Sequence, residues 1–247
     1  MRLHRETRPD VLALTMPHGV MRTHRFVPQG PPRGGLVVYM DVFGLRPELF
    51  DMCAGYAAEG FVVYLPNVFY RAGDVSFPPP SGPTDPTPPQ AVELNATTTL
   101  AMTAADLPAI LEHAGDIGNF AAIGYCMGGR HAINALATQP ARVKAAASIH
   151  GGRLVTPGDD SPHLLISKLQ GPAYFAFATD DHACPDTDQA MIRVEIVRAV
   201  IPHIVEKFDA QHGWSFPQRY CHDPVAAAQV RARSLHLFSQ ATGENDA

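Results

Sequence analysis

Short apolar runs alternate along this chain with longer stretches in which apolar residues recur at helical spacing. Two runs, residues 11–17 and 21–28, flank the dipeptide His18-Gly19 and predict an opening β-hairpin within residues 1–30. Further apolar runs predict buried strands over residues 35–44, 61–69, 120–125, 143–151, 173–179 and 203–208. The stretches between them predict helices over residues 47–59, about 97–113, 127–138, 187–199 and 224–239.

This order of strands and helices predicts the α/β class. Strands that alternate with helices form a mostly parallel central sheet with helices on both faces, joined by right-handed crossovers. The chain has 247 residues, of which 46% are hydrophobic and 17% charged, so it can bury one large core and we expect a single domain over residues 1–247. In such a sheet, ligands bind beyond the carboxyl ends of the strands.

The charge balance narrows the expected partners. A formal net charge of −5, a pI near 6.1 and the absence of an arginine run argue against nucleic acid, because phosphate binding needs clustered Lys and Arg. The N-terminus has no apolar core and no apolar run is long enough to span a membrane, which favours a cytoplasmic protein. The four cysteines form no CxxC pair, so we expect reduced thiols and no metal site. Small molecules are the expected partners, and the sequence leaves monomer and homodimer open.

One segment interrupts the alternation. Residues 76–90, with the sequence SFPPPSGPTDPTPPQ, are dense in proline, which fixes φ and has no amide donor, so they predict a surface loop. Such a loop is either a variable insertion or a rim over a binding site, and the sequence does not decide between the two.

The stretch Gly124-Tyr125-Cys126-Met127-Gly128 places a cysteine between glycines where a predicted strand meets a predicted helix. The spacing glycine-x-nucleophile-x-glycine is typical of the nucleophile elbow, a strained strand-to-helix turn. Glycines are needed because side chains two residues before and two after the nucleophile would collide with the neighbouring strand and helix. The helix N-terminus favours a thiolate and can bind an oxyanion. Cys126 is therefore the candidate nucleophile, and the alternative is a buried structural cysteine.

An acid and a histidine follow Cys126 at the places that a catalytic triad requires. In this topology the acid and then the histidine lie on loops after later strands. Asp181 follows the strand predicted at 173–179, and His212 follows the strand predicted at 203–208. His212 would take the thiol proton or pair with the thiolate, and Asp181 would fix the imidazole tautomer.

The motifs MDVFGL, GYCMGG, DDHACP and AQHGWSF resemble those of the dienelactone hydrolases, and the resemblance extends from about residue 36 to the last predicted helix. It implies an α/β-hydrolase fold with a Cys-His-Asp triad that cleaves a small ester or lactone, without a metal or organic cofactor. In that family the acid precedes a short segment ending in proline, which favours Asp181 over Asp180. The resemblance also implies an oxyanion hole formed by the backbone amides of Met127 and Val42.

Two features depart from the pattern of this family. Members that act on dienelactone carry a Glu that pairs with the resting thiol, and this chain has the shorter Asp41 there. They also hold the substrate carboxylate with two arginines, one before the second helix and one shortly after the catalytic histidine. The first is missing here, and Arg219 and Arg71 are candidate replacements; the alternative for each is an exposed, solvated side chain. These departures leave room for another ester or lactone as substrate.

Other residues lie close in sequence to the candidate triad. His150 lies near the end of the strand predicted at 143–151 and is a candidate to line the pocket. Phe43, Tyr125 and Trp214 flank the candidate catalytic positions and are either pocket walls or core residues. Structural or solvent-facing roles are expected for His131, His182, Cys184 and Cys221.

The sequence therefore predicts an α/β-hydrolase that attacks the carbonyl of an ester or enol-lactone with Cys126 and passes through an acyl-enzyme thioester. Two alternatives stay open. One is a non-catalytic α/β-hydrolase scaffold that binds a small molecule, and the other is an acyltransferase built on the same scaffold.

Overall fold

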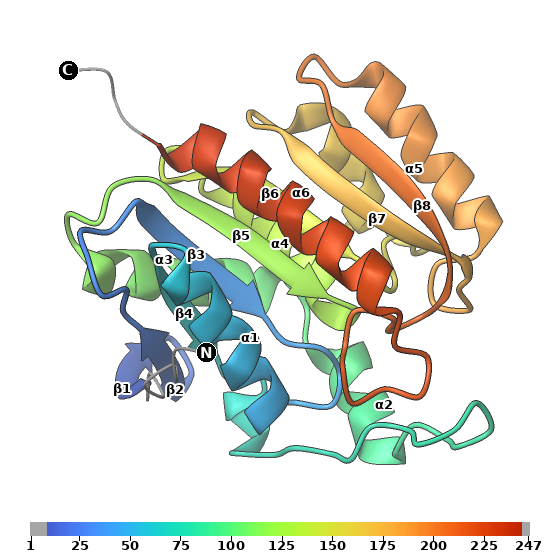
Figure 1. The fold of residues 1–247 in the computed structure, drawn as a ribbon, viewed down its shortest axis with the longest axis horizontal. Coiled ribbons are helices and arrows are strands. Elements are labelled where there is room, and N and C mark those ends of the chain that lie inside the picture. Colours follow the sequence, from blue (N-terminus) through green and yellow to red (C-terminus); the bar gives the residue numbers. More distant parts are fainter. Residues whose placement is uncertain (1–8, 244–247) are drawn as a thin grey trace.

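The computed structural model describes residues 9–243. Residues 1–8 lie outside the described residues. They hold most of the N-terminal stretch in which the sequence shows no apolar core. Eight strands form one sheet in the order β1-β2-β4-β3-β5-β6-β7-β8 (Figure 1). The strands are β1 (Asp10–Met16), β2 (Gly19–Phe26), β3 (Gly34–Tyr39), β4 (Phe61–Pro66), β5 (Phe120–Tyr125), β6 (Val143–Ile149), β7 (Ala173–Asp180) and β8 (Ile204–Gln211).

The sheet is antiparallel at one edge and parallel elsewhere. β1 and β2 form an antiparallel hairpin at the expected place, and β2 runs antiparallel to β4. All the pairs from β4 through β3, β5, β6 and β7 to β8 are parallel. The mostly parallel α/β sheet that the sequence predicts is confirmed. Because parallel strands end at the same edge, the loops after β3, β5, β6, β7 and β8 lie together.

Helices cover both faces of this sheet. Figure 1 shows α1 and α6 in front of the sheet and α4 behind it. The helices are α1 (Pro47–Ala58), α2 (Pro89–Thr97), α3 (Leu100–Ala114), α4 (Met127–Thr138), α5 (Asp186–Arg198) and α6 (Pro224–Thr242), with short 3₁₀ helices at Tyr70–Ala72 and Pro162–Lys168. The helix expected from about residue 97 begins at Leu100, because the Thr99 side chain caps it by accepting a hydrogen bond from the Met102 amide at 3.2 Å. α2 precedes it and was not predicted.

The central strands carry the core. β3, β4 and β5 are buried along their whole length, which explains why each is a continuous apolar run rather than an alternating one.

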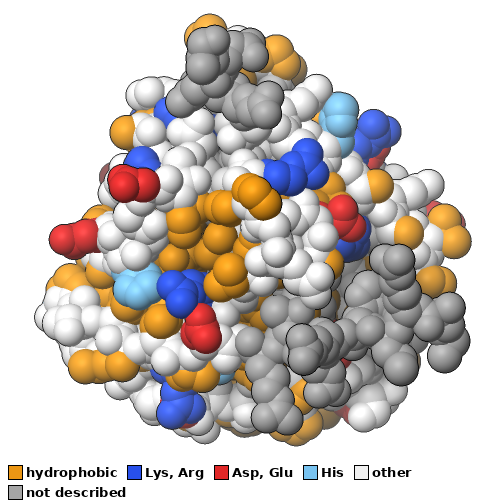
Figure 2. Space-filling view, turned by 60° about the vertical axis from the view of Figure 1, so that its left-hand side comes forward, with side chains coloured by type: hydrophobic (Ala, Val, Ile, Leu, Met, Phe, Trp, Pro, Cys, Tyr) orange, Lys and Arg blue, Asp and Glu red, His pale blue; other side chains and the backbone are white. Residues whose placement is uncertain are grey.

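Among residues 9–243, no helix is both long enough and apolar enough to cross a membrane. The face in Figure 2 has a hollow with hydrophobic side chains on its floor and charged side chains around it.

The proline-rich segment is a loop that starts beside the end of β3. Ser76 forms an isolated bridge with Gly44, and the amide of Phe77 donates to the carbonyl of Phe43 at 2.8 Å. Residues 77–88 contain no helix or strand, and the last two residues of the predicted loop, Pro89 and Gln90, begin α2 instead. The start of the loop is thus fixed next to the turn that contains Val42.

The turn from β5 into α4 leaves no room for side chains. A Cβ on Gly124 would overlap the backbone carbonyl of Gly128, and a Cβ on Gly128 would overlap the carbonyl of Tyr39 at the end of β3. Both glycines are therefore required by close backbone contact, as the spacing predicts. This packing sets the first turn of α4 directly against the end of β3.

Replacing Gly124 should reveal how tightly this turn is packed. We expect Gly124→Ala to lower the free energy of unfolding by about 3 kcal/mol, because the obstructing atoms are backbone and cannot rotate away. Urea denaturation measures the change. Gly30→Ala is the matched control, since a Cβ at Gly30 meets nothing within 4 Å. Equal losses in the two variants would contradict the packing described here.

Candidate active site

Cys126 occupies a strained turn at the carboxyl end of β5. Its backbone has φ 52° and ψ −116°, a region that residues other than glycine rarely adopt. Its amide donates to the carbonyl of Ile149 at 3.1 Å, and its carbonyl accepts from the amides of Gly129 at 3.0 Å and Gly152 at 2.9 Å. The side chain is partly exposed. The sulfur is thus held at the N-terminus of α4, within reach of small molecules.

His212 and Asp181 meet beside this turn. Asp181 follows β7 and His212 follows β8, and their Oδ1 and Nδ1 atoms lie 2.8 Å apart. The same carboxylate oxygen accepts from the amides of Ala183 at 2.9 Å and Cys184 at 3.1 Å, which fixes its orientation. The structure brings the side chain of Asp181 to His212, whereas the carboxylate of Asp180 is exposed and contacts Gln211.

The electrostatics of His212 tie it to Cys126 as well as to Asp181. Burial alone would lower the pKa of the imidazole, but the negative charge available on Cys126 and the hydrogen bond and charge of Asp181 raise it to about 10. An imidazolium therefore persists well above neutral pH. Nδ1 of this ring bonds Asp181, and Nε2 has no hydrogen-bond partner among the described residues, so a proton on Nε2 is available to balance a thiolate or to be donated to a leaving group.

Two backbone amides are available to bind an oxyanion. Among the hydrogen bonds of residues 9–243 that lie outside the regular helices and strands, none is donated by the amide of Val42 or by the amide of Met127. Val42 lies just beyond β3, and Met127 is the first residue of α4. Because Gly128 packs on the carbonyl of Tyr39, these two segments are neighbours. Free amides at a helix N-terminus bind negative oxygen.

Asp41 does not serve the thiol in this structure. Its two carboxylate oxygens accept hydrogen bonds from the guanidinium of Arg46 at 2.6 and 2.9 Å, and one also accepts from the amide of Phe43 at 3.1 Å. Arg46 further pairs with the buried Glu48 at 2.9 Å. The carboxylate of Asp41 is thus satisfied by Arg46, and no described hydrogen bond joins it to Cys126.

The two arginines singled out from the sequence have different surroundings. Arg71 forms a bidentate ion pair with Asp106, both distances being 3.0 Å, so its guanidinium is already neutralised and the structure does not bring it to the triad. Arg219 lies over the ring of Phe43, 5.2 Å from its centroid, and makes no ion pair among the described residues. Its buried Nε has no hydrogen-bond partner. Arg219 is therefore a free cation next to the turn that holds Val42.

Sequence reasoning missed two further arginines near Cys126. Arg130, one helical turn beyond it, is 5% exposed and donates only to neutral oxygens, those of Asn95 and Thr98. Arg153 is exposed and has φ 53°. Arg130 and Arg153 both line a cavity of about 270 Å³. Burial and, less strongly, the charge of Arg153 lower the pKa of Arg130 to about 10, although the charge of Cys126 opposes them. The position of Arg130 four residues after the cysteine was the only sequence signal.

Three of the four ring-bearing candidates, Trp214, His150 and Tyr125, are buried core residues, and Tyr125 also lines a separate cavity. Trp214 is fully buried and packs on Phe208 and His150. His150 is also fully buried and accepts a hydrogen bond from the amide of Cys126. The hydroxyl of Tyr125 lies 2.9 Å from that of Tyr56 on α1. The fourth, Phe43, is nearly buried beneath the guanidinium of Arg219.

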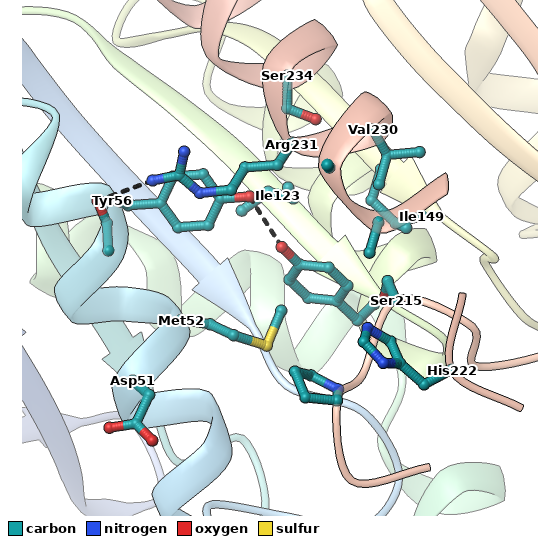
Figure 3. A pocket seen from close by; sticks show the side chains of 15 residues that line it. Asp51, Met52, Tyr56, Ile123, Ile149, Ser215, His222, Val230, Arg231 and Ser234 are labelled. Atoms are coloured by element: carbon teal, nitrogen blue, oxygen red, sulfur yellow. Dashed lines mark hydrogen bonds between the residues drawn. The ribbon is translucent and has the colours of Figure 1, made fainter. Parts of the chain in front are cut away.

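Tyr125 instead borders a cavity between α1 and α6. Figure 3 shows Tyr56 of α1 beside Arg231 of α6 in this cavity, and the Tyr56 hydroxyl lies 2.9 Å from that of Tyr125. The cavity measures about 250 Å³, and none of the three candidate catalytic side chains lines it. Its lining includes Tyr125, which directly precedes Cys126, and Ser215, three residues after His212.

The parallel sheet, the strained cysteine turn and the residues that follow β7 and β8 define an α/β-hydrolase. The chain belongs to the dienelactone hydrolase family, whose sequence profile matches residues 21–242. A Synechocystis sp. protein named "Putative carboxymethylenebutenolidase" is 26% identical over 216 residues, which cover 82% of this chain and 84% of the relative. An Escherichia coli (strain K12) protein of the same name is 24% identical over 217 residues, covering 85% and 78%.

Solved structures show the same fold at low sequence identity. A protein from Klebsiella pneumoniae described as a "Putative Dienelactone Hydrolase" has a TM-score of 0.81 and 20% identity, covering 94% of this chain and 98% of its own. The dienelactone hydrolase-like promiscuous phosphotriesterase P91, from metagenomic libraries, has a TM-score of 0.72 and 19% identity, covering 95% and 99%. The family and fold implied by the motifs are therefore confirmed, and the chain is a member of a hydrolase family.

The raised pKa of His212 can be tested by NMR. The Cε1 proton of His212 should titrate with a midpoint well above 6.5, and the midpoint should fall in Cys126→Ala, which loses one negative partner. The matching contribution to folding stability is full below pH 6.5 and is lost as the pH rises through about 10. His203 serves as an internal control, because burial lowers its pKa. A His212 midpoint at or below 6.5 in both proteins would contradict the pairing.

Proposed function

We propose that this protein hydrolyses a small ester or lactone through a Cys126-His212-Asp181 triad and an acyl-enzyme thioester. The observation that carries the proposal is His212, whose Nδ1 bonds Asp181 at 2.8 Å while the pKa of its ring is raised to about 10 by Cys126 and Asp181, despite burial. That charge distribution is the one that a thiolate and imidazolium pair needs. Membership of a hydrolase family supports the same reaction class.

Acylation begins when the Cys126 thiolate attacks the substrate carbonyl carbon. A carbon–sulfur bond forms and the carbonyl π electrons move to oxygen, where the free amides of Val42 and Met127 stabilise the oxyanion. When the carbonyl re-forms, the bond to the leaving oxygen breaks. That oxygen takes the proton from His212, which leaves a thioester and a neutral imidazole.

Deacylation uses the neutral His212 as a base. It takes a proton from water, whose oxygen attacks the thioester carbon and forms a second oxyanion at the same amides. Collapse breaks the carbon–sulfur bond, so the acid is released and the thiolate and imidazolium are restored. Asp181 keeps the imidazole oriented through both steps, because its Oδ1 is itself fixed by two backbone amides.

The proposed substrate carries an anionic group. No described carboxylate pairs with Arg219, Arg130 or Arg153. The charge of Cys126 raises the pKa of Arg130, so these two groups interact electrostatically. The name of the Synechocystis sp. and Escherichia coli relatives denotes a butenolide, a lactone, that bears a carboxymethylene substituent. A carboxylated lactone or ester would match both the nucleophile and these cations.

The nucleophile is tested by removing the thiol. Cys126→Ala should lower the rate of hydrolysis of p-nitrophenyl acetate and of cis-dienelactone by at least about 10³-fold, because no other group can form the acyl-enzyme. Burst and steady-state rates measure the loss. Cys221→Ser is the matched control, since Cys221 is the other partly exposed cysteine, and it should keep its activity.

Each outcome of that comparison has a distinct meaning. Full activity in Cys126→Ala would contradict the triad. Wild-type protein that turns over neither substrate would favour a non-catalytic scaffold. A burst without steady turnover, followed by turnover when an added alcohol or thiol takes the acyl group, would favour an acyltransferase.

The anionic group is tested by changing the cations one at a time. Arg219→Met and Arg153→Met should each raise the KM for cis-dienelactone by about 10- to 100-fold, because each variant removes a cation that binds the carboxylate of the substrate. The KM for the neutral p-nitrophenyl acetate should change little. Arg22→Met is the control, because Arg22 is half-exposed and already paired with Asp74. Equal effects on both substrates, or none, would remove the carboxylate from the proposal.

A further inference from the structure

His150 lies directly behind the nucleophile and has no contact with the open surface. Its place in the sequence made it a candidate to line the pocket, but its exposed fraction is 0%. We propose that His150, held by Ser215, is a positioning residue that fixes the backbone of Cys126 and supports the ring of His212. This inference rests on the proposed role of Cys126 as the nucleophile.

The segment that begins at His150 forms hydrogen bonds with both the backbone amide and the backbone carbonyl of Cys126. The Cys126 amide is shared between two acceptors, the carbonyl of Ile149 at 3.1 Å and Nδ1 of His150 at 3.2 Å. The Cys126 carbonyl accepts from the amide of Gly152 at 2.9 Å. The amide of His150 donates to the carbonyl of Ala176 on β7 at 2.8 Å, so this clamp is anchored in the sheet.

The hydrogen bonds determine the tautomer of His150. Nδ1 accepts from an amide, so it carries no proton, and a neutral ring then carries its proton on Nε2. Nε2 donates to Oγ of Ser215 at 2.7 Å. Burial lowers the pKa of His150 well below its ordinary value, and the charges of His212 and Arg219 lower it further, which keeps the ring neutral. The ring is therefore a fixed acceptor for the Cys126 amide.

Backbone strain at His150 accompanies this arrangement. Its φ is 38°, in the left-handed region that a non-glycine residue adopts at a cost. The strained conformation places the ring edge-on to Trp214, with centroids 4.8 Å apart, and to His212, with centroids 5.1 Å apart. One ring therefore contacts both the nucleophile turn and the catalytic imidazole, and its displacement would change the distance between them.

The experiment compares His150→Asn with His150→Phe in the full-length protein. Asn tolerates a positive φ, and its Oδ1 can accept a hydrogen bond near the position of Nδ1. Phe keeps an aromatic ring of similar packing but has no acceptor. We expect His150→Phe to lower kcat by about 10- to 100-fold with little change in KM, because the reacting atoms are displaced rather than the substrate. His150→Asn should keep most of kcat.

A second readout follows the thiol itself. The rate at which iodoacetamide alkylates Cys126 at neutral pH should fall in His150→Phe and be restored in His150→Asn. His163→Phe is the matched control, because His163 is another buried histidine that bonds a serine, with its Nδ1 2.7 Å from Oγ of Ser161. It should lose thermal stability without losing kcat. If His150→Phe does not fold, Ser215→Ala replaces it, and a fall in kcat without a change in KM is expected.

The outcomes separate this inference from the proposed function. Wild-type kcat in His150→Phe, or in Ser215→Ala where that variant replaces it, would overturn the positioning role. Equal losses in His150→Asn and His150→Phe would overturn it too, because the acceptor would then not matter. Activity that survives Cys126→Ala would refute the proposed function itself, whatever the His150 variants show.

Discussion

Close backbone packing at the turn between β5 and α4 is the constraint on which the site depends. With no side chain at Gly128, the first turn of α4 lies on the carbonyl of Tyr39, and this contact brings the helix N-terminus to the end of β3. The free amides of Val42 and Met127 become neighbours for that reason alone. The candidate oxyanion site is therefore a consequence of helix packing, and Cys126 bears the backbone strain that the packing requires.

A buried ion network holds the other side of the site. Asp41 and Glu48 share the guanidinium of Arg46, and Oε1 of Glu48 accepts from the amide of Gln218 at 2.7 Å. The network therefore ties the turn after β3 to the loop that follows His212. Separating the two loops would leave buried charges without partners, so the network couples the positions of these loops. Asp41 contributes to this network by accepting from the Arg46 guanidinium and the Phe43 amide.

The sequence predicted what depends on local pattern. Continuous apolar runs indicated the parallel strands, and the glycine spacing around Cys126 indicated the strained turn, because both follow from short-range sterics. α2 was missed since its prolines resembled the loop before it, although proline is tolerated in the first turn of a helix. The partner of Asp41 was also missed, because a pattern gives the position of a carboxylate but not which of several neighbouring cations it meets.

The cations near Cys126 show why net charge was a poor guide to the ligand. The whole chain carries a formal charge of −5, which excludes a general attraction for polyanions, yet the local field decides what enters a site. Burial and the nearby Arg153 both destabilise the charge on Arg130, and no described carboxylate offsets either effect. A thiolate, an oxyanion and a carboxylate on the substrate would each relieve that destabilisation. In the proposed mechanism, the cations that would stabilise the Cys126 thiolate would therefore also favour an anionic substrate.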